Sequence, residues 1–106
     1  MEKPLVLVKH DVNTSDEKSP DGDGWIHYWE RRTQNIIPEE CPCCKEKTSD
    51  RNPMVGAHVI KFVDILKTSP KRYITPTCKE CNDKYKEGKA WKIFSVLPEH
   101  LLKSPY

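Results

Sequence analysis

The sequence predicts one small α+β domain organised around a cluster of cysteines, and three observations carry that prediction. Four of the five cysteines form two pairs with C-x-x-C spacing, Cys41/Cys44 and Cys78/Cys81. The chain has 106 residues, a length typical of a single domain. Hydrophobic residues make up only 36% of the chain and charged residues 32%, which is a thin apolar supply for a chain of this size.

The two cysteine pairs predict a structural zinc ion. Two thiolates separated by two residues can bind one metal ion from a tight turn, and two such pairs supply the four soft ligands of a closed tetrahedral site. A structural metal also stabilises a small chain whose core is thin. We therefore expect Cys41, Cys44, Cys78 and Cys81 to bind Zn²⁺. Cys43 is expected to be a spare thiol beside them, with its exchange for Cys44 as the alternative.

The N-terminal part is expected to contribute a strand and an aromatic segment. Residues 4–8 are apolar without a helical period and predict a short strand. Residues 13–24 are rich in Asp, Ser, Gly and Pro and predict a loop. Residues 25–34 begin with aromatic side chains and continue with good helix formers, which favours a helix, with a strand as the alternative.

The cysteine pairs flank a predicted hairpin. Residues 41–47 predict a metal-binding knuckle, and residues 55–60 a strand in which Gly56 marks a bulge or a close backbone approach. Residues 73–76 predict the returning strand. Residues 78–87 predict a helix that begins at the second cysteine pair and ends at Gly88.

Less regular segments complete the chain. Residues 62–66 predict a helical turn or an extended stretch, residues 91–97 a strand or an irregular apolar segment, and residues 98–102 a short turn. Within the domain 1–106 we therefore distinguish an N-terminal extension packed on the core, a zinc core and a C-terminal apolar segment. Their ranges are 1–40, 41–88 and 89–106.

Charge is distributed unevenly along the chain. Residues 1–40 carry 5 basic and 9 acidic side chains, whereas residues 41–106 carry 13 basic and 7 acidic ones. A basic C-terminal half permits binding of DNA or RNA, and a protein partner is the alternative. The apolar run at residues 5–8 is too short for a secretory signal or a membrane span, and paired C-x-x-C spacing suits a metal better than disulfides. We therefore expect a cytoplasmic, intracellular protein without a membrane partner.

A knuckle, a hairpin and a helix that opens with C-x-x-C follow one another as in a treble clef. In this order the chain resembles HNH-type endonucleases of the four-cysteine kind, with Gly56-Ala-His-Val59 and Tyr73 to Asn82 as the matching segments. It is more closely similar to a family of small, largely uncharacterised bacterial proteins. Their shared features are a Trp, a His-x-Trp-Glu-like segment, a cysteine pair, Gly-Ala-His-Val and Tyr-Ile-x-Pro-x-Cys-x-x-Cys-Asn, and the resemblance spans residues 25–82. Both resemblances imply a zinc-bound treble clef with HNH-like ββα organisation, to which this chain adds an N-terminal strand and the aromatic segment.

The HNH resemblance implies a metal-dependent endonuclease that hydrolyses phosphodiesters. His58 would be the general base that takes a proton from the attacking water, and Asn82 would bind a second divalent ion such as Mg²⁺ or Mn²⁺. Ala57, which cannot bind a metal, stands where another ligand belongs. The Asn that orients the base would fall near Tyr73. These departures favour the alternative that the chain is a catalytically degenerate treble clef serving as a protein-interaction or regulatory module.

Each of these residues also has a structural interpretation. His58 is then a buried structural histidine or a zinc ligand in place of one cysteine, and Asn82 hydrogen-bonds to free amides near the helix start. The aromatic residues of 25–29 either stack on bases or form the core. Five lysines either contact phosphates or lie on a solvated helix face. These are Lys79, Lys84, Lys86, Lys89 and Lys92.

Overall fold

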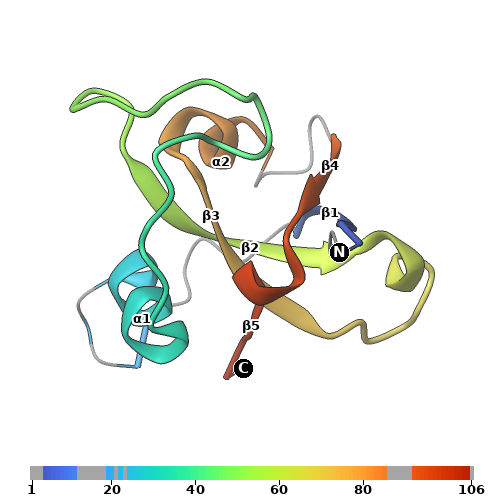
Figure 1. Cartoon of the computed structure of the whole chain (residues 1–106). Helices are drawn as coiled ribbons and strands as arrows, with labels where there is room; N and C mark the ends of the chain where they lie inside the picture. The colour runs from blue at the N-terminus through green and yellow to red at the C-terminus, as the bar shows by residue number, and fades with distance from the viewer. Residues whose placement is uncertain (1–3, 12–18, 21, 23, 86–91, 106) are drawn as a thin grey trace.

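The computed structural model describes residues 4–11, 19, 20, 22, 24–85 and 92–105. The described residues form a five-stranded antiparallel sheet and two α-helices, which confirms the α+β class (Figure 1). The strands are β1 (Val6–His10), β2 (Met54–Lys61), β3 (Arg72–Cys78), β4 (Ile93–Val96) and β5 (Leu102–Lys103). The helices are α1 (Trp25–Thr33) and α2 (Lys79–Tyr85), with short 3-10 turns η1 (Phe62–Asp64) and η2 (Pro98–His100). The strand order is β4-β1-β2-β3-β5.

The β2–β3 hairpin is the centre of the sheet. Its register pairs Met54 with Cys78 at one end and Ile60 with Arg72 at the other. A strand rises about 3.3 Å per residue, so the two ends of β3 lie roughly 20 Å apart. The hairpin therefore separates two regions of the molecule, one that contains the cysteines and one that surrounds the start of β3.

The two faces of the sheet carry different hydrophobic cores. Val59 of β2 packs with Val8, Phe94 and the cysteines, and its cross-strand partner Tyr73 packs against the same cluster. The next positions, His58 and its partner Ile74, point to the other face because side chains alternate along a strand. There α1 covers the sheet, with a core that comprises Tyr28, Trp29 and Ile74.

The aromatic segment is a helix, as the sequence favours, and it belongs to the core. Trp29 is completely buried, and its indole Nε1 donates a hydrogen bond to the carbonyl oxygen of His100, 2.9 Å away. Tyr28 is also buried, and Trp25 meets it edge-on. Burial of this kind favours the core interpretation of these residues over base stacking.

The remaining elements differ modestly from the predicted ones. β2 and β3 are each longer than predicted, residues 62–64 form the η1 turn, and β4 occupies residues 93–96 of the C-terminal apolar segment. The end of the predicted helix at 86–88, Trp91 and most of the predicted loop 13–24 lie outside the described residues. Among the described residues, no helix has both the length and the apolar character needed to cross a membrane.

Candidate metal centre

The first cysteine pair lies in a tight turn between α1 and β2. The Cys41 amide donates to the Glu46 carbonyl at 2.9 Å, and the Lys45 amide donates to the Cys41 carbonyl at 2.8 Å. Lys45 adopts a left-handed conformation with φ of 68°, which closes the turn. An isolated bridge between Glu40 and Lys47 joins the two flanks. This is the knuckle predicted at residues 41–47, and it presents Cys41 and Cys44 from one compact loop.

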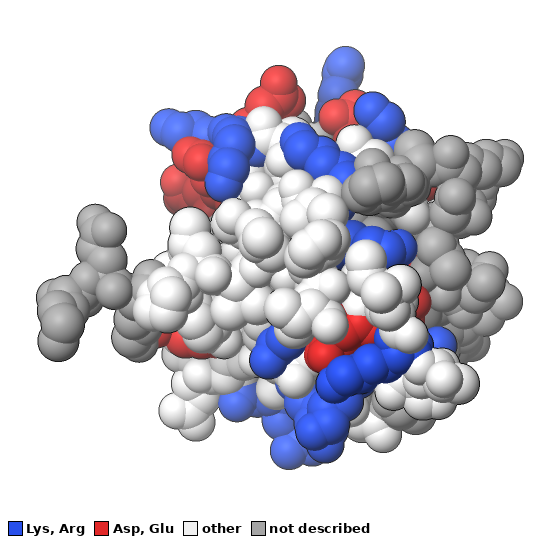
Figure 2. Space-filling view, turned by 90° about the vertical axis from the view of Figure 1, so that its right-hand side faces the viewer, with Lys and Arg blue, Asp and Glu red and all other residues white. Residues whose placement is uncertain are grey.

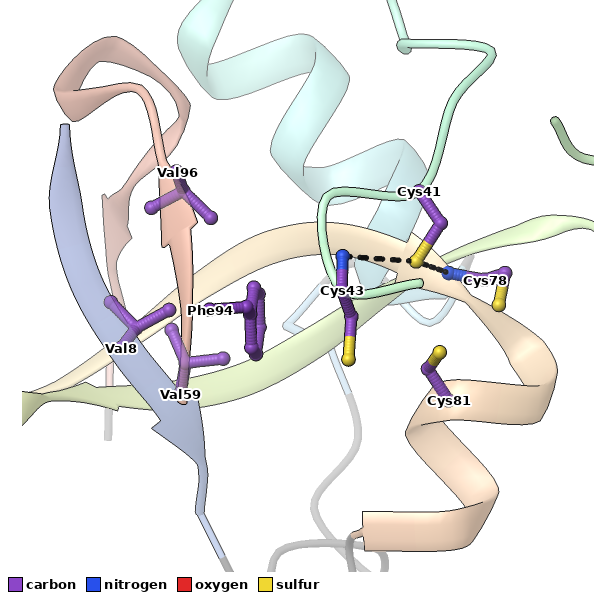
Figure 3. Packing of buried hydrophobic residues seen from close by; sticks show 8 residues of the cluster. All are labelled: Val8, Cys41, Cys43, Val59, Cys78, Cys81, Phe94 and Val96. Atoms are coloured by element: carbon purple, nitrogen blue, oxygen red, sulfur yellow. Dashed lines mark hydrogen bonds between the residues drawn. The ribbon is translucent and has the colours of Figure 1, made fainter. Parts of the chain in front are cut away.

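Backbone amides surround the Cys41 sulfur. The amides of Cys43 and Cys78 donate to Cys41 Sγ at 3.4 and 3.3 Å (Figure 3). Hydrogen bonds of this kind stabilise a thiolate and fix its orientation, as the outer partners of metal ligands generally do. The Cys78 amide comes from β3, so it also joins the knuckle to the second cysteine pair.

The second pair is positioned by the junction of β3 and α2. Cys78 is the last residue of β3, and Cys81 lies in the first turn of α2. Asn52, from the loop before β2, accepts a hydrogen bond from the Glu80 amide at 2.8 Å through Oδ1. The Lys79 amide donates to the Pro53 carbonyl at 2.9 Å. Two otherwise unsatisfied amides of the helix start are thus capped from another segment, which fixes Cys81 relative to Cys78.

The four predicted cysteines come together in space. The sulfur atoms of Cys41, Cys44, Cys78 and Cys81 all lie within 4.8 Å of one another, and Sγ of Cys44 and Sγ of Cys78 are 3.8 Å apart. A tetrahedron with Zn–S bonds of about 2.3 Å has edges of about 3.8 Å, so this arrangement fits one such ion. Three of the four side chains are buried. The cluster can hold a metal ion and is consistent with structural zinc.

The environment of the thiols explains why a cation suits this cluster. Burial raises the pKa of Cys44, and burial together with the neighbouring Cys78 thiol raises the pKa of Cys81. For Cys78 burial also acts to raise the pKa, but hydrogen bonds from the Cys81 amide and the Asn52 side chain outweigh it and lower the pKa. A divalent ion would favour the thiolates and displace their protons, so its binding would weaken at acid pH.

Cys43 lies beside this group without being part of it. Its side chain is buried, and this burial raises the pKa of the Cys43 thiol. A hydrogen bond to Cys81 acts in the opposite direction without outweighing burial. Figure 3 shows its sulfur pointing toward Cys81 and the region of Phe94. Its carbonyl accepts a hydrogen bond from Lys92 Nζ at 2.7 Å. This placement fits the spare thiol that the 41/44 spacing predicts.

The structure does not place His58 and Asn82 on the same side of the sheet. His58 is buried on the α1 face, where its ring meets Trp25 edge-on with the ring centroids 4.7 Å apart. Asn82 lies in α2, whose Cys81 and Tyr85 pack on the opposite, cysteine-containing face. The same separation disfavours His58 as a zinc ligand. Among the described residues, the four cysteines are the one group of three or more His, Cys, Asp or Glu side chains close enough to share a metal.

The lysines near α2 already have contacts. Lys79 forms an ion pair with Asp83 at 2.6 Å, Lys84 lies over the Tyr85 ring, and Lys92 binds the Cys43 carbonyl. Lys86 and Lys89 lie outside the described residues.

Positive charge is in excess at the far end of the sheet, which we call the basic end, although Lys67 pairs with Asp64 and Arg72 with Asp11 there. It comprises the residues around the end of β2, the start of β3 and β5. Its described basic side chains are Lys9, Lys61, Lys67, Lys71, Arg72 and Lys103, and its described acidic ones are Asp11 and Asp64. Figure 2, which faces this side of the molecule, shows lysine and arginine side chains massed along its lower part.

Two features of the site have no signal in the sequence. Asn52 caps α2 from a distant loop, although an Asn-Pro pair by itself predicts only a turn. The basic end depends on the pairing of β3 with β5, which joins charges more than 30 residues apart.

Comparison with family models, with curated proteins and with solved structures found no match to this chain.

Proposed function

We propose that this chain is a zinc-stabilised treble-clef module that binds nucleic acid through its basic end and does not cleave it. The observation that carries the proposal is the uneven distribution of charge along the sheet, with an excess of basic side chains at one end only. Among the residues that the structure describes, the basic end contains six basic side chains and two acidic ones. A surface of this kind attracts a polyanion, because binding of phosphates releases their condensed counterions.

The opposite end offers no such attraction. The described acidic and basic side chains around the cysteines balance one another. The acidic ones are Glu39, Glu40, Glu46, Asp50, Glu80 and Asp83, and the basic ones are Lys45, Lys47, Arg51, Lys79, Lys84 and Lys92. Four thiolates bound to one Zn²⁺ would add about two negative charges. The zinc site would thus stabilise the fold and leave contact with the ligand to the basic end.

The geometry gives hydrolysis little support. A general base must reach the water that attacks the phosphate, and a metal must lie beside the same phosphate. His58 is buried against Trp25 on one face, and Asn82 belongs to the helix on the other. We therefore propose that His58 has a structural role here, and the likeness to HNH endonucleases remains a prediction about the fold.

Fluorescence anisotropy with labelled single-stranded DNA, duplex DNA and RNA tests the proposal. We expect wild-type protein to bind at least one of them, with an affinity that falls as salt rises. The double variant Lys61→Glu/Lys67→Glu should bind more weakly, with a salt slope smaller by about one for each lost phosphate contact. The control pair Lys45→Glu/Lys47→Glu, at the cysteine end, should bind as wild type does. Equal losses of binding affinity in the two double variants would refute the assignment of the basic end as the binding surface.

Plasmid incubated with the protein and Mg²⁺ or Mn²⁺ tests the absence of cleavage. We expect intact plasmid with wild type and with His58→Ala alike. Cleavage by wild type that the His58→Ala substitution abolishes, in a variant that keeps its metal, would instead establish the endonuclease.

A protein-interaction module is the second candidate, and exposed apolar side chains favour it. Val63 is 81% exposed and Leu66 95% exposed, both in the connection between β2 and β3. Figure 2 also shows a broad uncharged area above the basic side chains. Failure to bind any of the three nucleic acids at low salt would favour this candidate.

A further inference from the structure

We infer that a cavity at the basic end is a binding site for a phosphate group. The inference deepens the proposed function, on which it rests for the identification of that phosphate with a nucleic-acid backbone. The cavity has a volume of about 460 Å³ and lies where β3, β5 and the end of β1 meet. It is lined by Asp11, Thr68, Ser69, Pro70, Lys71, Arg72, Lys103 and Ser104.

Hydrogen bonds between neighbouring segments hold the walls of this cavity in place. The Ser104 amide donates to the Arg72 carbonyl at 2.9 Å, which continues the pairing of β5 with β3. The Asp11 amide donates to the His58 carbonyl at 2.9 Å, which anchors the end of β1 to β2. Arg72 Nε and Asp11 Oδ2 form an ion pair at 2.5 Å across the cavity wall. Because the β1, β3 and β5 sides of the cavity are already fixed, a ligand need not order them on binding.

The charges of the cavity favour an anion. Three cationic side chains line it against one carboxylate, and that carboxylate is engaged by Arg72. Lys71 directly precedes β3 and Lys103 lies in β5, and neither has an ion-pair partner within the described part of the chain. Two ammonium groups bind phosphate oxygens as point charges, whether the phosphate is a singly charged backbone phosphodiester or a doubly charged monoester.

The other lining groups favour a phosphate over a base. Thr68 and Ser69 supply hydroxyl groups, which donate hydrogen bonds to phosphate oxygens. The described lining contains no aromatic side chain on which a base could stack. A phosphate group therefore fits the cavity, whether it belongs to a nucleic-acid backbone or to a small phosphorylated molecule.

Titration of the zinc-bound 106-residue chain with inorganic phosphate, followed by NMR at constant ionic strength, tests the inference. We expect saturable amide shifts confined to residues 68–72 and 103–104. The variant Lys71→Gln/Lys103→Gln should lose about tenfold or more in phosphate affinity, because charged hydrogen bonds are removed. The matched control Lys45→Gln/Lys47→Gln should bind phosphate as wild type does. Thermal unfolding of both variants verifies that each remains folded.

A second titration, with a short oligonucleotide, separates this inference from the proposed function. Saturable phosphate binding at the cavity without oligonucleotide binding would refute the nucleic-acid function and leave a site for a small phosphorylated ligand. Oligonucleotide binding that is unchanged in Lys71→Gln/Lys103→Gln, with no saturable phosphate shifts, would refute the cavity and leave the function. Shifts that rise linearly with phosphate, or a loss of phosphate affinity in Lys45→Gln/Lys47→Gln as large as that in Lys71→Gln/Lys103→Gln, would also overturn the inference.

Discussion

Gly56 of β2 lies directly against the start of α1, so that a Cβ at this position would come within 2.6 Å of the carbonyl carbon of Trp25. The Trp25 Cβ and the Ile26 amide nitrogen would be almost as near, at 2.7 and 2.8 Å. The contact atoms are mainly backbone, which cannot rotate away. The absence of a side chain at Gly56 is therefore what allows α1 to approach the sheet, and the predicted close backbone approach is confirmed.

The Gly56→Ala variant should be less stable than wild type. The added methyl would push α1 from the sheet, and overpacking of this kind costs about 1–3 kcal/mol of the free energy of unfolding. Zinc content should be unchanged, because the cysteines lie on the other face. Urea unfolding and metal analysis check both parts. A variant as stable as wild type would contradict the packing described for α1.

Two cysteine substitutions should have different effects. Cys78→Ser removes a predicted zinc ligand, and we expect loss of the metal and of most of the folded structure, since metal binding is coupled to folding. Cys43→Ser should keep one zinc ion per chain and lose only about 1–3 kcal/mol, because it buries a hydroxyl in place of a thiol. Circular dichroism and elemental analysis of both variants make the comparison. Loss of zinc from Cys43→Ser alone would indicate that Cys43 replaces Cys44 as a ligand.

Asn52→Ala should weaken the metal centre without removing a ligand. The substitution leaves the Glu80 amide without its cap, at a cost of about 1 kcal/mol. It also removes a hydrogen bond that lowers the pKa of Cys78, so the thiol should compete less well with protons for zinc at neutral pH. Competition with a chelator measures the affinity. Asn35→Ala, which removes an amide contact to the Glu99 carbonyl away from the cysteines, is the control and should leave the affinity unchanged.

His10 should make stability depend on pH. Burial, together with the charge of Lys9, lowers the pKa of His10 from 6.5 to about 4. The ring packs between Tyr85 and Phe94, with centroids 5.6 and 5.3 Å away. Between pH 6.5 and 4 the unfolded chain binds a proton that the folded chain does not. The free energy of unfolding should therefore fall as pH falls through this window, by about 3 kcal/mol in total at 1.4 kcal/mol per unit.

His10→Phe isolates this contribution. Phenylalanine can occupy the same aromatic stack and does not titrate. Protonation of the thiols also destabilises the protein at low pH, but it does so in both proteins. The difference in stability between wild type and His10→Phe should therefore change across pH 6.5 to 4, and curves that stay parallel would exclude His10 as the source.

The sequence predicted the elements that depend on local patterns. Apolar runs between turn residues located β2 and β3, and the C-x-x-C spacing located the knuckle and the start of α2. Good helix formers after the aromatic residues favoured α1. These signals are local, because each is set by the residues of one element and its immediate neighbours.

The missed features depend on contacts between distant segments. His58 points away from the cysteines, toward the face of the sheet that α1 covers. A shift of one residue in the register of β2 would reverse the direction of this side chain. The cap from Asn52 requires the loop before β2 to meet the start of α2. Lys103 joins Lys71 at one cavity only because β5 pairs with β3.

X-ray absorption spectroscopy at the zinc edge tests the central claim most directly. The described geometry predicts one zinc ion per chain with four sulfur neighbours at about 2.3 Å. Three sulfur atoms and one nitrogen would contradict the four-cysteine centre and would require a histidine to reach the cluster. Protein that folds without bound metal would contradict the structural role of zinc altogether.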